Sequence, residues 1–237
     1  MKDYELSHSL RRSIGKALSD YSMIDQNDKV LVALSGGKDS LLLLHALNHF
    51  KAHSPVKFNL AALTVKINDE MNTAPLQEYC RVHDIDYYIH TQPIIEIINL
   101  RQEKSPCSFC ANMRRGILSN WAASNGFNKL ALGHTMDDAV ETFFLNLFHT
   151  GRSQSFMPTA FMSRTGVHVI RPLVLSTEAM IIDEVKRLEL PVMKSTCPFA
   201  GYTHRAKIRE IIADLRKNYV NDLYAKIIHA LNWENNK

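Results

Sequence analysis

Short β-rich apolar runs alternate with longer stretches of helical period, and this alternation constrains the fold more than any other feature of the sequence. The runs that read as buried strands are Lys29 to Leu34, Leu60 to Val65, Tyr87 to His90, Lys129 to Leu132 and Val167 to Arg171. Strands separated by helices pair in parallel through crossover connections. We therefore predict an α/β fold with a doubly wound parallel sheet, and ligands at the carboxyl ends of its strands.

Helical segments flank this expected sheet at both ends of the chain. Apolar residues recur at helical spacing near the start, at Leu6, Leu10, Ile14, Leu18 and Tyr21. The region 203–233 is also helical in period, whereas Pro93 to Pro106 fits neither a helix nor a loop cleanly. We predict an N-terminal helix packed on the core (1–24), a main domain (25–195) and a C-terminal turn with a helical extension (196–237).

Composition excludes several classes of protein. Apolar residues make up 46% and charged residues 22% of the 237, as in ordinary globular proteins. No apolar run approaches the roughly 18 residues that span a bilayer, and residues 1–12 do not resemble a secretory signal. We expect no membrane partner and a cytoplasmic location. Four cysteines are too few for a disulfide scaffold of this length, and the net charge of +4 does not identify a nucleic-acid binder.

A glycine-rich hexapeptide, Ser35-Gly36-Gly37-Lys38-Asp39-Ser40, lies directly between the first strand and the helix that follows it. Two glycines let the backbone approach an anion, and the amides of a helix N-terminus attract phosphate oxygens. Lys38 adds a positive charge. The alternative is a tight turn with Ser and Asp at the helix cap. The spacing differs from the Gly-x-x-x-x-Gly-Lys loop, which disfavours γ-phosphate transfer.

A second segment, Gly133-His134-Thr135-Met136-Asp137-Asp138, follows the fourth strand. Paired carboxylates beside a triphosphate are natural Mg²⁺ ligands. The same acids also suit a helix N-terminus, where they complement the helix dipole, and the histidine also fits a buried turn. Both readings stay open at this stage.

Three of the cysteines fall in two turns. Cys107 and Cys110 form a Cys-x-x-Cys at the start of an expected helix, and Cys197 follows the turn opened by Pro191. Such thiols suit zinc, a redox dithiol or an iron–sulfur cluster, and spacing does not separate these options. A closed zinc site needs a fourth ligand, for which His204 is the candidate. Cys80 lies on an apolar helix face and is expected to be a core thiol.

These motifs resemble those of the PP-loop ATP pyrophosphatases, and among them the cluster-dependent tRNA thiolases that make two-thiocytidine. The match runs from about Asp28 to Arg216. The resemblance implies that ATP adenylates the C2 oxygen of a tRNA base, which sulfur then replaces. It also implies three partners or cofactors besides ATP, namely Mg²⁺, a 4Fe–4S cluster and a sulfur donor such as a cysteine desulfurase or sulfide. The oligomeric state is open, with a homodimer among the options.

The resemblance assigns a role to each motif residue. Phosphate and nucleotide would be held by Ser35, Gly36, Gly37, Lys38, Ser40, Gly133 and His134. Catalytic roles would fall to Asp39, Asp137 and Arg114, and Asp138 would be a magnesium ligand. Three thiolates, of Cys107, Cys110 and Cys197, would hold the cluster and leave one iron open to sulfide.

The chain also departs from its apparent relatives. It has a Cys-x-x-Cys, which lysidine synthetases lack, and no N-terminal array of paired cysteines like that of the zinc-bearing two-thiouridine synthetases. Ala200 stands where the two-thiocytidine pattern often has another cysteine. A two-thiouridine product therefore stays an alternative. So do a PP-loop ligase or amidotransferase acting on a small molecule, and a zinc module that binds RNA.

A basic segment near the C-terminus is the expected contact with tRNA. Residues 201–217 contain five positive residues, Arg205, Lys207, Arg209, Arg216 and Lys217, against two acids. Such a face can follow RNA phosphates, with Phe199 or Tyr202 stacking on an extruded base. The alternative is an ordinary solvated helix face.

Overall fold

The computed structural model describes residues 5–194, 196–199, 204–231 and 233, and its centre is a six-stranded sheet of order β3-β2-β1-β4-β6-β5. The strands are β1 (Lys29–Ala33), β2 (Asn59–Lys66), β3 (Asp86–Thr91), β4 (Lys129–Ala131), β5 (Thr159–Met162) and β6 (Val167–Ile170). Every pair is parallel except β5 with β6. The predicted doubly wound sheet is confirmed, and its order reverses between β1 and β4.

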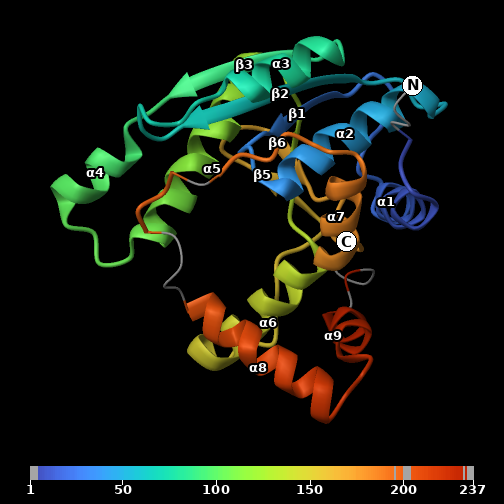
Figure 1. The fold of residues 1–237 in the computed structure, drawn as a ribbon, viewed down its shortest axis with the longest axis vertical. Helices are drawn as coiled ribbons and strands as arrows, with labels where there is room; N and C mark the ends of the chain where they lie inside the picture. Colours follow the sequence, from blue (N-terminus) through green and yellow to red (C-terminus); the bar gives the residue numbers. More distant parts are fainter. Residues whose placement is uncertain (1–4, 195, 200–203, 232, 234–237) are drawn as a thin grey trace.

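Helices cover both faces of this sheet (Figure 1). On one face lie α1 (His8–Asp20), α2 (Lys38–His53), α3 (Ala74–Val82) and α7 (Glu178–Arg187). On the other face lie α4 (Ile94–Arg101) and α5 (Pro106–Ser124). Two separate hydrophobic cores result, because each face of the sheet buries its own set of apolar side chains. None of the described helices is both long and apolar enough to cross a membrane.

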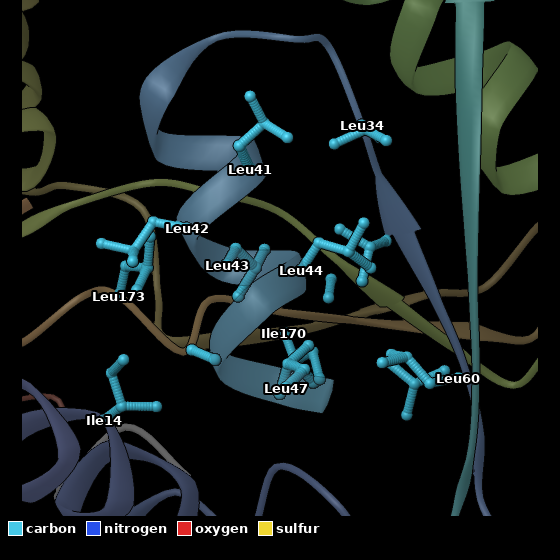
Figure 2. Close-up of a cluster of buried hydrophobic side chains, with 14 of the residues drawn as sticks. Ile14, Leu34, Leu41, Leu42, Leu43, Leu44, Leu47, Leu60, Ile170 and Leu173 are labelled. Carbon is cyan, nitrogen blue, oxygen red and sulfur yellow. The ribbon is translucent and has the colours of Figure 1, made fainter. Parts of the chain in front are cut away.

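Helix α2 has four consecutive leucines after its first turn, which place apolar side chains on every side of the helix and explain why this part is buried. Leu41 to Leu44 and Leu47 are each 0% exposed. Figure 2 shows these side chains between the strands, α1 and the segment after β6, with Leu34 and Ile14 on opposite sides. Burial of each leucine is worth about 1.5–3 kcal/mol. The start of α2, which is the expected phosphate loop, therefore rests on a rigid base.

Two elements differ from what the sequence pattern indicates. The undecided interval after Pro93 contains α4, in which Ile94 and Ile98 are buried. Strand β5 was not predicted, because it lies at the edge of the sheet and does not alternate between buried and exposed residues. Phe161 in β5 is 60% exposed.

The C-terminal extension folds as two helices on α6 (Met136–Thr150), and Figure 1 shows this group standing away from the sheet. These helices are α8 (His204–Asn218) and α9 (Leu223–Leu231). Val140 and Phe144 of α6 pack with Ile208 and Ile212 of α8. After α9, Trp233 is buried against Tyr21, with ring centroids 6.2 Å apart. The division of the chain at residues 24 and 195 stays a prediction.

Candidate functional site

The loop between β1 and α2 is held in shape by its own serines. The hydroxyl of Ser40 accepts the backbone N–H of Ser35 at 3.1 Å and donates to the carbonyl oxygen of Gly37 at 2.9 Å. The two serine hydroxyls are 3.0 Å apart. Gly37 is the N-cap of α2 and has no side chain to cap the helix. The first amides of α2 thus stay available to an anion.

Gly133, which follows β4, lies directly against this loop. A Cβ at Gly133 would be 3.1 Å from the backbone carbon of Asp39 and 3.2 Å from the backbone nitrogen of Ser40. The Ser35–Ser40 loop and the Gly133–Asp138 segment therefore meet backbone to backbone. They do so because β1 and β4 are neighbours and both loops leave the carboxyl ends of their strands.

Lys38 lies between two carboxylates. Its ammonium is 2.8 Å from Glu178 and 3.1 Å from Asp39. Burial lowers the pKa of Lys38, but the hydrogen bonds and charges of these acids outweigh burial and raise the pKa above its ordinary value. Glu178, at the start of α7, was missed by sequence reasoning. The sequence signal that could have found it is an acid at the start of the helix that follows β6, because β6 lies next to β4 in the sheet.

Asp39 is partly buried and lies close to two further carboxylates. Burial raises its pKa, the charge of Lys38 acts against this, and the charges of Asp138 and Glu178 raise it further. Its Oδ1 atom is buried without a hydrogen-bond partner among the described residues. An acidic oxygen left unpaired next to further carboxylates fits the oxygen ligands that Mg²⁺ takes.

The two acids of the second motif have different surroundings. Asp138 accepts the backbone N–H of Thr135 at 3.0 Å in a capping box, and its other oxygen is 3.6 Å from Arg205. Asp137 instead accepts the backbone N–H of Glu178 at 2.7 Å, at the N-terminus of α7. Asp138 lines a cavity at the phosphate loop, whereas Asp137 is not among the described residues that line it.

Two cavities adjoin at the phosphate loop. The first, of about 400 Å³, is called the phosphate-side cavity, and its lining includes Ser35, Gly37, Asp39, Ser40, Arg114, Arg115, Gly133, His134 and Asp138. The second, of about 300 Å³, is called the thiol-side cavity, and its lining includes Ser35, Gly37, Val65, Ile67, Met71, Cys110, Arg114, Met193, Thr196 and Cys197. Ser35, Gly37 and Arg114 line both. The structure thus brings cysteines from two distant turns next to the phosphate loop.

Cys107 and Cys197 both lie within electrostatic reach of Cys110. Burial raises the pKa of Cys110, the charge of Arg114 lowers it, and Cys197 and Cys107 raise it further. Within the described ranges, no three His, Cys, Asp or Glu side chains are grouped as ligands of a single metal ion. The thiolates of a multi-iron cluster bind different irons and stand further apart than the ligands of one ion. The side chain of His204, the expected fourth zinc ligand, is outside the described residues.

The basic segment on α8 is partly used within the protein. Arg205 and Arg209 both pair with Glu141 of α6, which is 2% exposed, and the Arg205 contact is 3.0 Å long. Arg216 lies over the ring of Tyr224 at 4.4 Å. Lys207 and Lys217 are exposed. At least two of the five positive charges therefore hold α8 on α6. Tyr202, one of the two residues expected to stack on a base, is outside the described residues.

Comparison with known proteins identifies the family. The family model described as a PP-loop domain matches residues 6–215. The chain belongs to the PP-loop family. Its relatives include a tRNA-cytidine(32) 2-sulfurtransferase of Stenotrophomonas maltophilia (strain K279a), 38% identical over 216 residues that cover 89% of this PP-loop chain and 69% of that protein. The protein of the same name from Geobacter metallireducens is 34% identical, over 91% and 86% of the two chains.

Solved structures agree with this assignment. The U34-tRNA thiolase NcsA from Methanococcus maripaludis, solved with its 4Fe–4S cluster, superimposes with a TM-score of 0.75 at 26% identity, over 94% of this PP-loop protein and 78% of that chain. The NH3-dependent NAD synthetase of Campylobacter jejuni shares the fold, with a TM-score of 0.53 at 17% identity over 100% and 95% of the chains. The resemblance to the PP-loop tRNA thiolases is thereby confirmed.

Proposed function

We propose that this PP-loop protein is an ATP-dependent tRNA sulfurtransferase that replaces the C2 oxygen of a cytidine with sulfur. The observation that carries the proposal is the junction of the two cavities at Ser35, Gly37 and Arg114. ATP activation and sulfur delivery need neighbouring pockets, because the activated base must reach both. Relatives at 34% and 38% identity are named for this reaction at cytidine 32.

The phosphate-side cavity would bind ATP. Phosphate oxygens would meet the amides at the start of α2 and the hydroxyl of Ser35. Lys38 would turn from Glu178 and Asp39 toward the phosphates, since its ammonium already lies beside the loop. Asp39 and Asp138 would hold Mg²⁺, which prefers carboxylate and phosphate oxygens.

The reaction would proceed in two displacements. The C2 oxygen of the base attacks the α-phosphorus of ATP, and pyrophosphate leaves into the loop. Sulfide then adds to C2, and adenylate leaves with the former base oxygen. Arg114 lines both cavities, so its guanidinium can bind α-phosphate oxygens through both displacements.

Cys107, Cys110 and Cys197 would act as thiolate ligands beside the thiol-side cavity, whose lining includes Cys110 and Cys197. When bound there, a 4Fe–4S cluster would supply an open iron that carries sulfide from a donor such as a cysteine desulfurase. Burial raises the pKa of Cys110, so loading the site must remove its proton. Arg114 lowers that pKa and thereby favours the thiolate.

A two-thiouridine product is the second candidate, because the thiolase with the TM-score of 0.75 acts on U34 of tRNA. One experiment separates the two. Nucleosides from tRNA of a strain that lacks the gene are analysed by mass spectrometry, with and without a plasmid copy. Loss and recovery of two-thiocytidine supports the proposal, loss of two-thiouridine supports the second candidate, and unchanged thionucleosides contradict both.

The cysteine variants test the site itself. Replacing Cys107, Cys110 or Cys197 by Ser should abolish thiolation in the complemented strain, because each removes a ligand. Cys80→Ser is the matched control, since Cys80 is 0% exposed on the buried face of α3. Equal loss with Cys80→Ser would contradict the ligand assignment. If anaerobic purification gave colourless, iron-free protein, a small-molecule ligase or amidotransferase would be favoured. If Asp39→Ala left every activity unchanged, a zinc module that binds RNA would be favoured.

A further inference from the structure

A histidine and an arginine from two neighbouring strands meet at the edge of the phosphate-side cavity. His134 follows β4 and Arg171 follows β6, and the backbone N–H of Leu132 donates to the carbonyl oxygen of Ile170 at 2.9 Å. The Nε of Arg171 donates to Nδ1 of His134 at 3.2 Å. Its Nη1 donates to the carbonyl oxygen of Met157 at 2.6 Å. Both partners hold the guanidinium in one orientation.

This hydrogen bond determines the tautomer of His134. A guanidinium has donors only, so Nδ1 of the imidazole must accept and the ring proton must lie on Nε2. Burial and the charge of Arg171 lower the pKa of His134 to about 4. The charge of Asp138 on α6 raises this pKa, and the charge of Arg205 on α8 lowers it further. The ring is therefore neutral near pH 7. A neutral imidazole can serve as a hydrogen-bond donor.

Arg171 itself is a buried cation, 9% exposed. Its side-chain hydrogen bonds go to His134 and Met157, and no Asp or Glu of the described residues forms an ion pair with it. The ring of Phe156 lies under it at 5.0 Å and contacts His134 at the same centroid distance. Burial, and then the charge of Arg115, lower the pKa of Arg171 to about 10, so it stays charged near pH 7. An uncompensated buried cation favours an anion nearby.

We propose that Arg171 is a positioning residue that locks His134 as an Nε2–H donor to a phosphate oxygen of the nucleotide. The lock works because the cation occupies Nδ1 and leaves Nε2 for the cavity that His134 lines with Ser35 and Asp39. His134 then acts as a fixed donor and does not take up a proton during the reaction. This inference rests on the proposed function only in naming the nucleotide as the anion.

The test is ¹⁵N NMR of the histidine rings in the full-length protein, with the His134 signal assigned by its loss in His134→Gln. At pH 7 the wild type should show an unprotonated Nδ1 and a protonated Nε2, and the Nε2 signal should move when pyrophosphate is added. Arg171→Met should give mixed tautomers and weaken pyrophosphate binding about tenfold, the usual effect of losing one hydrogen bond to a charged group. Arg171→Lys should keep the charge but lose the single tautomer.

Arg164→Met is the matched control, because Arg164 is exposed in the turn between β5 and β6. It should leave the tautomer and pyrophosphate binding unchanged. A wild-type spectrum with a protonated Nδ1, or a cationic ring at pH 7, overturns the proposal even if the Arg171 variants do not fold. So does an Arg171→Met variant with the wild-type tautomer. Because no readout involves sulfur, a protein that passes this test yet thiolates no tRNA overturns only the proposed function.

Discussion

The backbone N–H of Met193 donates to the carbonyl oxygen of Gly36 at 2.9 Å, which joins the phosphate loop to the segment leading to Cys197. A second link lies three residues after Met193, where the hydroxyl of Thr196 donates to the side-chain oxygen of Asn68, after β2, at 3.4 Å. The third cysteine is thus placed by contacts with the two loops that follow β1 and β2. Phosphate binding and thiol placement share one piece of backbone.

Gly36→Ala should push the phosphate loop away from the Met193 segment that leads to Cys197. Gly36 has a φ of +81°, and an added Cβ would lie 2.7 Å from Sδ and 3.2 Å from Cβ of Met193. The left-handed backbone costs about 1 kcal/mol for alanine, and Met193 must also move. We expect pyrophosphate release from ATP to fall at least tenfold, measured with a coupled phosphate assay.

Gly166→Ala is the matched control for that variant. Gly166 has a φ of +72° in the turn between β5 and β6, and a Cβ there would meet nothing within 4 Å. Its unfolding free energy, measured in urea, should fall by about as much as the left-handed backbone costs in Gly36→Ala. Its pyrophosphate release should stay at the wild-type rate. Equal loss of activity in both variants would mean that strain alone, and not the contact with Met193, explains the effect.

Gly133→Ala should disturb the nucleotide site from its other side. The new Cβ would press against the backbone of Asp39 and Ser40, at 3.1 and 3.2 Å, and backbone cannot move aside as a side chain can. ATP affinity, measured by calorimetry, should weaken about tenfold or more. Gly116→Ala, in the interior of α5 with open space around it, should bind ATP normally and be more stable by up to about 1 kcal/mol.

The sheet and the phosphate loop could be predicted from the sequence because their signals are local. Buried parallel strands such as β1 and β2 read as continuous apolar runs, and the glycine pair directly follows one of them. Strand β5 could not be predicted, since an exposed edge strand with one antiparallel partner has no such pattern. Glu178 was missed because its link to Lys38 joins residues 140 positions apart, and no local pattern records such a pair.

The roles of the paired acids show the same limit. Asp137 and Asp138 are adjacent and chemically identical, so the sequence does not separate them. The helix geometry of α6 turns Asp138 toward the phosphate-side cavity and Asp137 toward the start of α7. In the basic segment likewise, composition counts the charge of Arg209 but does not reveal the buried Glu141 that pairs with it.

Glu141→Gln should loosen α8 from α6. The carboxylate is 3% exposed in its side chain and pairs with Arg205 and Arg209, which are 43% and 56% exposed. Because both arginines remain partly solvated, the loss should be about 1–2 kcal/mol, below that of a fully buried pair. Hydrogen exchange of the α8 amides should quicken while that of β1 does not.

Asp222→Asn is the control for Glu141→Gln. Asp222 pairs with Lys226 at 2.9 Å, and both side chains are more than 60% exposed. Its unfolding free energy should stay within about 0.5 kcal/mol of the wild type. If the two variants behaved alike, Glu141 would not be the residue that holds α8 in place.

Cys80 should make stability depend on pH in the alkaline range. Burial raises the pKa of its thiol from 9.0 to about 11, so between these values the unfolded chain loses a proton that the folded chain keeps. A raised pKa gives stability that is fully present below about pH 9 and is lost as pH rises toward about 11. Cys80→Ala lacks this contribution and should be less stable near pH 7, because it leaves a small cavity. The difference in unfolding free energy between wild type and variant, from urea titrations, should therefore shrink from pH 8.5 to pH 10.5. A constant difference across that range would show that the thiol does not titrate differently in the folded and unfolded states.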